Sequence, residues 1–297
     1  MGIGEVSALT AAACWATGSM LYSRIPLSAA GISFAKNSIG SMVLLVHLAI
    51  HSLVMQTPMF RADAASWLWL SLSGLMGIVI GDTFYFRSLQ ILGPRRALMV
   101  STSSPVFAAI LGWLFLSETV SIVSAAGMTL TLVGVAGVIS DRRAEKESPG
   151  LFPGTISSGV VQGFLGAVFS AGGAVASRHG LSGSDPLEAA FIRILTSAMM
   201  GSVLVLFPGR LATITKTVLR PTVIRTFLPA VLLGTWLGIW LSQIAYKHST
   251  VAIAMTLLST TPLFATPLVR ILSGVQITAW SVLSTVVAIA GVYLTVH

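Results

Sequence analysis

The chain has 297 residues, of which 55% are apolar and only 9% are charged, and its mean hydropathy is +0.90. Because a soluble domain carries about 25% charged residues, this composition excludes a soluble globular protein and also a disordered or collagen-like chain. The net charge of +8 comes from Lys and Arg scattered between apolar runs, which excludes nucleic-acid binding, and the single cysteine, Cys14, excludes a disulfide framework or a thiolate metal cluster.

Apolar runs long enough to cross a bilayer follow one another along the whole chain. Crossing a hydrocarbon core of about 30 Å takes about 20 mostly apolar helical residues. We therefore predict an all-α integral membrane protein with ten transmembrane helices, and we expect the mixed basic and apolar segment Arg210–Arg225 to lie on the membrane surface. The predicted spans are Glu5–Tyr22, Ala29–Met55, Ala65–Gln90, Arg96–Leu116, Val120–Ser140, Ile156–Ala176, Pro186–Phe207, Thr226–Tyr246, Ser249–Leu272 and Thr278–Val296.

The two halves of the sequence are copies of each other. Residues 34–135 match residues 191–292 at a constant offset of 157, and the first spans match at an offset of 154. We predict a first repeat in residues 1–140, a polar linker in 141–155 and a second repeat in 156–297. Five spans per copy is an odd number, so the second copy must enter the membrane from the opposite side. The identical pairs include Phe34/Phe191, Met42/Met199, Gly77/Gly234, Gly81/Gly238, Ala97/Ala254, Pro105/Pro262, Phe107/Phe264 and Gly134/Gly291.

An inverted repeat indicates transport, because two such copies can exchange conformations and move a central site from one membrane face to the other. The third span of each copy carries a GxxxG motif, Gly77 with Gly81 and Gly234 with Gly238. Small residues one turn apart let helix backbones approach closely in lipid, so we expect these glycines to pack against neighbouring helices.

The fourth span of each copy carries hydroxyl residues followed by proline, which predicts a kinked helix. Pro105 and Pro262 each remove one backbone donor and clash with the carbonyl four residues back. Freed carbonyls are tolerated at membrane depth where hydroxyls, water or other helices satisfy them. We interpret these segments as candidate cavity walls, the alternative being static kinks bonded to their own side chains. The hydroxyl residues that we assign to the cavity are Ser103, Ser104, Thr260 and Thr261.

Several segments of the first half resemble the EamA repeat of the drug/metabolite transporter superfamily. The similar segments are Cys14-Trp15-Ala16, Gly81-Asp-Thr-Phe-Tyr-Phe-Arg-Ser-Leu89, Arg96-Ala97-Leu98, Ser104-Pro-Val-Phe-Ala-Ala109 and Phe115-Leu-Ser-Glu118, with a basic residue near the start of each second span. The resemblance implies a ten-span carrier whose central cavity is lined mainly by the first four spans of each half, with the fifth spans peripheral. One departure is Glu118, because Val275-Gln276 stands at the matching place of the second half.

Among the charged residues inside the predicted spans, where an ionised group costs at least about 2.5–3.5 kcal/mol, we single out Asp82, Lys36 and Arg193. We interpret Asp82 as a proton-coupling carboxylate or the partner of a substrate ammonium, the alternative being an ion pair with a basic residue of another helix. Its counterpart in the second copy is Ile239. Lys36 and Arg193 are counterparts of each other, and two cations beside one cavity would favour a substrate carboxylate or phosphate. Snorkelling or structural pairing is the alternative for these two.

Aromatic and polar residues of the first and third spans complete the candidate substrate cavity, although packing is the alternative for each. They are Trp15, Phe169, Tyr85, Trp236 and Gln243. His47 and His51 stand four residues apart, a spacing that can bind a metal ion. No third ligand is placed nearby, so we expect interfacial histidines and no metal site.

The motifs GxxxxGK[ST], GxSxG and HExxH are absent from the sequence, which excludes an ATP-driven pump and weakens the case for a hydrolase. We predict a non-enzymatic secondary transporter without a cofactor, exporting a small metabolite such as an amino acid. Its partners would be the substrate, the lipid bilayer and, through Asp82, protons. The alternatives are a passive channel, or a membrane enzyme or lipid-handling protein on the same scaffold.

The expected location is a cell membrane, with both termini on one face. Lys and Arg concentrate in the odd-numbered connections, which by the positive-inside rule places the termini outside the cell. Similar transporters are described with both termini inside, so the orientation stays open, as do the substrate and the oligomeric state.

Overall fold

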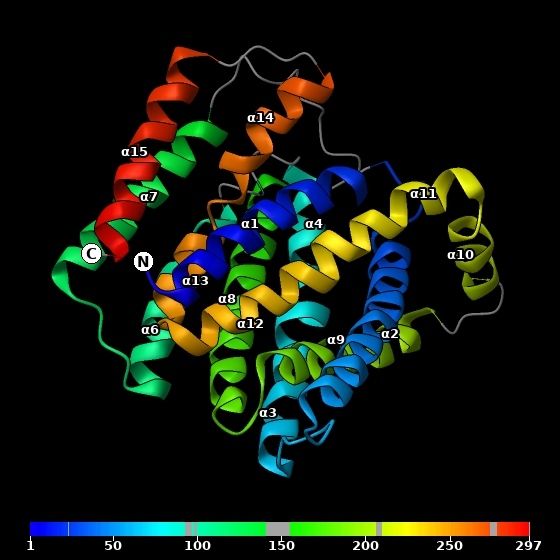
Figure 1. The fold of residues 1–297 in the computed structure, drawn as a ribbon. Helices are drawn as coiled ribbons and strands as arrows, with labels where there is room; N and C mark the ends of the chain where they lie inside the picture. The colour runs from blue at the N-terminus through cyan, green and yellow to red at the C-terminus, as the bar shows by residue number, and fades with distance from the viewer. Residues whose placement is uncertain are drawn as a thin grey trace.

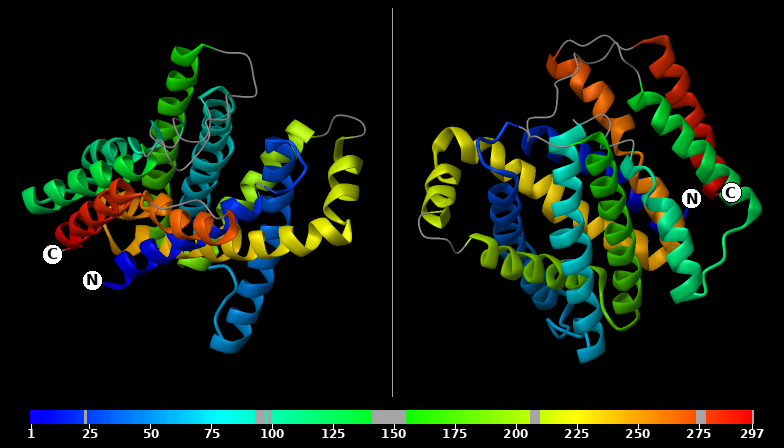
Figure 2. Two further views of the ribbon diagram at one scale, coloured as in Figure 1. Left: turned by 90° about the horizontal axis from the view of Figure 1, so that it is seen from above. Right: turned by 180° about the vertical axis from the view of Figure 1, so that it is seen from behind.

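The structure is a computed structural model that describes residues 1–22, 24–92, 97, 100–140, 155–205, 210–273 and 278–296 (Figure 1). Within these ranges every regular element is a helix, as the sequence predicts. The beginning of the first helix and the end of the last lie close together in every view (Figures 1 and 2). The predicted linker lies outside the described residues except for Thr155, whose side chain accepts a hydrogen bond from the N–H of Ser158 and so caps the helix that follows.

The first half folds into five helical segments, and three of their helices begin at a capping side chain. Ser28, Asp63 and Ser121 each accept a hydrogen bond from the N–H three residues later. The third segment is interrupted by a π-helix at its middle. The elements are α1 (Ile3–Tyr22), α2 (Ala29–Met55), α3 (Ala64–Ser73) with η1 (Gly74–Gly81) and α4 (Asp82–Leu92), α6 (Ser104–Leu116) and α7 (Ile122–Ile139).

The second half repeats this order, including a π-helix in its third segment. The elements are α8 (Ile156–Gly180) with the 3-10 turn η2 (Leu181–Gly183), α9 (Pro186–Val205), α10 (Arg210–Val218), α11 (Pro221–Ala230) with η3 (Val231–Leu237) and α12 (Gly238–His248), α13 (Val251–Leu258), α14 (Thr261–Ser273) and α15 (Ala279–Val296).

The segment Arg210–Arg225, expected to form one unit on the membrane surface, is divided between α10 and the first turn of α11. Pro221 starts the second helix, since proline fits the first turn of a helix but not its interior. Ile214 and Val218 of α10 are buried in a cluster with Phe227 of α11. This helix therefore packs against the protein along its apolar face.

Corresponding helices of the two halves run antiparallel where they meet. In the α2–α9 pair, a Cβ built on Gly40 would lie 3.6 Å from Ile194, and one built on Gly201 would lie 3.9 Å from Phe34. Contacts therefore move backwards along α9 as they move forwards along α2. The α7–α15 pair behaves in the same way, since Gly127 faces Thr295 and Gly134 faces Ala288. Figures 1 and 2 show α7 and α15 side by side at the edge of the molecule.

The GxxxG glycines bring the third segment of each half against the first segment of the other half. A Cβ on Gly173 of α8 would lie 2.7 Å from the Cα and N of Gly77 in η1, and one on Gly18 of α1 would lie 2.8 Å from the Cα of Gly234 in η3. These distances are shorter than any real Cβ contact, so only glycine permits the approach. Gly77 and Gly234 are equivalent positions in the repeat, and Gly173 is the residue after Gly172, the counterpart of Gly18.

The outer surface of the molecule is apolar, which a lipid environment explains. On α15 the exposed side chains recur at helical spacing as Trp280, Leu283, Val286, Ile289 and Tyr293, each more than half exposed. Within the described part of the chain, six helical stretches are long and apolar enough to cross a membrane. They are Ala30–Met55, Ala64–Leu89, Ile122–Ile139, Ile156–Gly183, Pro221–His248 and Ala279–Val296, and the shorter apolar helices Ser104–Leu116 and Val251–Ala265 accompany them. The protein is therefore a multi-pass membrane protein.

The seam between α8 and η1 gives a first prediction. Gly173→Ala places a methyl group against the backbone of Gly77, and overpacking of this kind costs about 1–3 kcal/mol. We expect a clearly lower melting temperature of the purified protein in detergent, measured by intrinsic fluorescence. Gly201→Ala is the matched control, because its Cβ meets only Phe34 at 3.9 Å and should leave the melting temperature unchanged or slightly raised. Equal melting temperatures for the two variants would contradict the predicted close packing.

Candidate functional site

A cavity of about 400 Å³ lies at the interface of the two halves and is lined by residues of both. The first half contributes α1, α2, η1, α4 and the start of its fourth segment, and the second half contributes α8, α9, η3, α12, α13 and α14. Of the described residues, those of α7 and α15 take no part in the lining and pack mainly against each other. The volume suits a small organic molecule.

Three charged side chains from three helices face this cavity. Lys36 of α2 forms an ion pair with Asp82 at the start of α4, with 3.8 Å between Nζ and Oδ2. The side chains are 15% and 36% exposed, so the pair is open to the cavity rather than sealed in the protein. The structure thus contains the interhelical ion pair that was one alternative for Asp82. Arg193 of α9 also faces the cavity, and its charge acts on Asp82 at longer range.

The fourth segment of each half is broken rather than kinked at its hydroxyl and proline residues. A turn at Thr102 and Ser103 precedes α6, and a turn at Ser259 and Thr260 separates α13 from α14. The proline is the second residue of the new helix in both halves, a position at which no backbone donor is needed.

Hydroxyl groups satisfy the carbonyls that these prolines leave unpaired. Ser104 Oγ donates to the carbonyl of Ser101 at 2.8 Å, and Thr261 Oγ1 donates to the carbonyl of Leu258 at 2.7 Å. These are the carbonyls four residues before each proline. The hydroxyl groups of the break are thus engaged by their own helix, although Ser104, Thr261 and Pro262 all line the cavity. Polar backbone at membrane depth is tolerated in this way beside a cavity.

Aromatic side chains of α1 and α12 form further parts of the wall. The Tyr22 hydroxyl lies 2.9 Å from Thr235 Oγ1, which ties α1 to η3, and the Tyr246 hydroxyl donates to the sulfur of Met255 at 3.2 Å. Trp15 reaches the cavity beside Gly238, where a built Cβ would lie 2.6 Å from the indole ring. The second glycine of this GxxxG motif therefore makes room for a lining side chain.

The cavity lining contains the seam glycines Gly77 and Gly234 and eight of the other residues that were proposed from the sequence. These eight are Trp15, Lys36, Asp82, Tyr85, Ser104, Arg193, Thr261 and Pro262.

The structure places five other proposed cavity residues outside the lining. Gln243 is fully buried, accepts a hydrogen bond from Ser177 and donates to Ser242 at 3.2 Å. Phe169 stacks on Phe84 with ring centroids 5.7 Å apart, and Trp236 donates to His47 Nδ1 at 3.1 Å. The hydroxyl groups of Ser103 and Thr260 donate to the carbonyls of Val100 and Leu257. Pro105, Gly81 and Gly238, proposed for the kink and for packing, also lie outside it.

Several lining residues were not proposed from the sequence, although helical spacing could have found them. Ser19 and Tyr22 follow Trp15 by four and seven residues, and Phe86 follows Asp82 by four. On η3 and α12, the lining residues Thr235, Ile239, Ser242 and Tyr246 recur every three or four positions. Extending Trp15 and Asp82 along their helix faces would have identified Ser19, Tyr22 and Phe86, whereas the residues proposed on the third segment of the second half, Trp236 and Gln243, lie beside its lining face.

His47 packs against two tryptophans of the second half. It accepts a hydrogen bond from Trp236 at 3.1 Å, and its ring centroid lies 4.8 Å from that of Trp240. In the described ranges, no group of three or more His, Cys, Asp or Glu side chains is placed to hold a metal ion.

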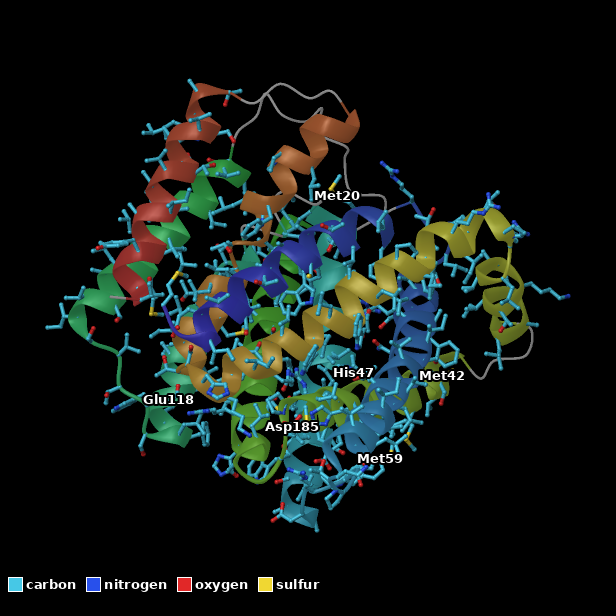
Figure 3. All side chains as sticks on the ribbon, in the orientation of Figure 1. Met20, Met42, His47, Met59, Glu118 and Asp185 are labelled. Atoms are coloured by element: carbon cyan, nitrogen blue, oxygen red, sulfur yellow. The ribbon has the colours of Figure 1, made fainter. Side chains whose placement is uncertain are left out.

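A second set of polar contacts joins the halves at the end of the molecule where α2, α6 and α8 terminate. Figure 3 shows Met59, Glu118 and Asp185 toward this end and Met20 toward the other. Glu118 accepts the N–H of Val251 at 2.8 Å and lies 3.6 Å from Arg178 Nε. Partial burial raises the pKa of the Glu118 carboxyl, while the Val251 N–H and the Arg178 charge lower it.

Comparison with known proteins adds a family match and a fold match. The model of the EamA-like transporter family matches residues 2–140 and 157–297, once in each half. A solved structure described only as "Crystal structure of protein" is 17% identical over 98% of this chain and 95% of that chain, with a TM-score of 0.74, which shows a common fold. No curated protein matches the chain.

The neighbouring hydroxyl residues Thr260 and Thr261 at the second helix break allow a test of the cavity lining. In a Cys14→Ala background, Thr261→Cys should react with a water-soluble thiosulfonate reagent at least about tenfold faster than Thr260→Cys, because Thr261 is half-buried and lines the cavity whereas Thr260 is buried outside the lining, and thiol reactivity follows exposure. Mass spectrometry of the purified protein in nanodiscs measures the rates. The control differs from the test position by one residue. Equal rates for the two variants would contradict the lining described above.

Proposed function

This chain belongs to the EamA-like transporter family, and we propose that it is a secondary carrier that exports a small metabolite, such as an amino acid, by alternating access. In this proposal ten segments cross a cell membrane, both termini lie on one face, and the two halves form an inverted repeat. The repeat units are residues 1–140 and 156–297, joined by the linker 141–155. Polar contacts such as the Glu118–Arg178 pair would hold the halves together at one end of the cavity.

The observation that carries the proposal is the position of the cavity between two halves whose corresponding helices are antiparallel. A site on the axis that relates two inverted copies is accessible from either face when the copies exchange conformations. The seams at Gly18–Gly234 and Gly77–Gly173 and the α2–α9 contact are among the contacts between the halves that would adjust in this exchange. A channel would need an open path on both sides of the site at once.

A counterflow experiment distinguishes a carrier from a channel. Proteoliposomes preloaded with an unlabelled compound from a panel of amino acids and monocarboxylates should take up the same radiolabelled compound faster than empty ones, and uptake should saturate. Both effects follow because one binding site is exposed alternately to each side. Linear flux without acceleration would indicate a channel, and chemical conversion of the label would indicate an enzyme. Protein-free liposomes provide the background.

We further propose that Asp82 couples transport to protons, since protonation of this carboxyl would break its ion pair with Lys36 inside the cavity. Asp82→Asn should abolish the uptake driven by an imposed pH gradient but leave exchange of labelled for unlabelled substrate intact. Asp185→Asn is the matched control, because Asp185 lies outside the cavity lining and accepts the N–H of Leu187 at the start of α9, a role that Asn can also fill. An Asp82→Asn protein with normal pH-driven uptake would refute the coupling role.

A further inference from the structure

The charges of the cavity do not follow the symmetry of the repeat. Lys36 and Arg193 are equivalent positions of the two halves, but the acid that pairs with Lys36 has no equivalent. The position of Asp82 is occupied by Ile239 in the second half, and Ile239 lines the cavity on α12, which packs against the Arg193 helix α9. Lys36 is therefore neutralised by an acid 3.8 Å away, whereas the position that would supply the equivalent acid for Arg193 holds an aliphatic residue.

Arg193 has few partners for a buried guanidinium. Arg193 is only 6% exposed, and its Nε has no hydrogen-bond partner. Nη1 lies 3.4 Å from Ser177 Oγ, and the guanidinium carbon lies 5.9 Å from the ring centre of Tyr246. No carboxylate of the described residues lies within 4.0 Å of it. A buried charge without a counterion is unfavourable, so this group favours occupation of the cavity by an anion.

The antiparallel packing of α2 and α9 keeps Asp82 from serving both cations. Gly40 contacts Ile194, and Phe34 contacts Gly201. Lys36 on α2 therefore lies opposite a part of α9 that is about six residues after Arg193. Six residues of helix correspond to about 9 Å along the axis. Since Asp82 lies beside Lys36, it acts on Arg193 only at longer range.

We propose that Arg193 binds the carboxylate of the transported molecule and that this molecule is a small organic anion with one net negative charge. The proposal rests on the proposed function in taking the cavity as the substrate site, and it replaces the amino acid given there as an example with a monocarboxylate. The planar guanidinium offers two parallel N–H donors that match a carboxylate. Trp15, Tyr85 and Phe86 provide an aromatic wall for an apolar body. Asp82 is engaged by Lys36, so no acid in this lining is free to pair with a substrate ammonium.

Three probes that share a phenethyl group separate the charge requirement from the fit. 3-Phenylpropionate carries one negative charge, phenylalanine adds an ammonium group, and phenethylamine lacks the carboxylate. Binding to the purified protein in nanodiscs is measured by isothermal titration calorimetry. We expect 3-phenylpropionate to bind at least about tenfold more tightly than either of the other probes, which is the scale of one charge-assisted hydrogen bond.

Two sets of variants test the role of Arg193. Arg193→Gln should weaken 3-phenylpropionate binding about tenfold to a hundredfold, whereas Arg24→Gln, at an exposed position outside the lining, should not change it. Ile239→Asp places an acid at the position equivalent to Asp82 and leaves Arg193 in place. It should weaken binding about tenfold relative to Ile239→Asn, a variant of nearly equal size without the charge. The second set remains informative if Arg193→Gln does not fold.

The outcomes distinguish this inference from the carrier proposal. Three results would overturn the assignment of an anion to Arg193. The first is that phenylalanine or phenethylamine binds as tightly as 3-phenylpropionate or more tightly, and the second is that 3-phenylpropionate does not bind. The third is that Ile239→Asp and Ile239→Asn bind 3-phenylpropionate equally well. Counterflow of any compound of the panel would then still support a carrier. Absence of saturable counterflow with intact 3-phenylpropionate binding would instead refute the carrier and keep the anion site.

Discussion

Close backbone contacts at glycines join helices of opposite halves, and the architecture around the cavity depends on them. At Gly18–Gly234 and Gly77–Gly173 the helices approach so closely that a methyl group would collide with the facing backbone. In lipid there is little hydrophobic drive to bring helices together, so such packing is a main source of association. Gly77 and Gly234 also line the cavity. The walls of the site therefore belong to two different halves, pressed together at equivalent places on either side of it.

The irregular backbone of the molecule is concentrated beside this cavity and is repeated in both halves. The π-helices η1 and η3 carry the seam glycines, and the turns before α6 and α14 interrupt the fourth segments. π-Helical turns are rare and occur mostly at functional sites. The hydroxyls of Ser104 and Thr261 satisfy the carbonyls that the prolines release. Because both breaks are satisfied within their own chain segment, each fourth segment presents a bent, polar wall without help from a neighbouring helix.

The sequence predicts the helical segments and the duplication well, because a constant offset and long apolar runs are properties of the chain itself. It predicts the rotation of each helix poorly. Each residue that was proposed for the cavity and lies outside its lining is adjacent to a residue that lines it: Ser103 to Ser104, Phe169 to Ser170, Trp236 to Thr235, Gln243 to Ser242 and Thr260 to Thr261. One residue turns a helix by about 100°, and only the packing of the neighbouring helices decides which of two adjacent side chains faces inward.

The backbone obeys the symmetry of the repeat and the charges do not. Asp82 corresponds to Ile239, and Glu118 corresponds to Val275-Gln276, which lies outside the described residues. The first half thus provides the acid in the cavity, Asp82, and the acid that contacts Val251 and Arg178, Glu118, whereas each half provides one basic residue to the cavity, Lys36 and Arg193. For a carrier whose halves exchange conformations, identical halves would give two states of equal energy. Each acid that has no counterpart in the other half would make one state more stable than the other. A free-energy difference of about 1–2 kcal/mol changes the ratio of the two populations by about tenfold or more. In such a carrier, the charges that distinguish the halves would set both what the cavity attracts and the side from which it is open at rest.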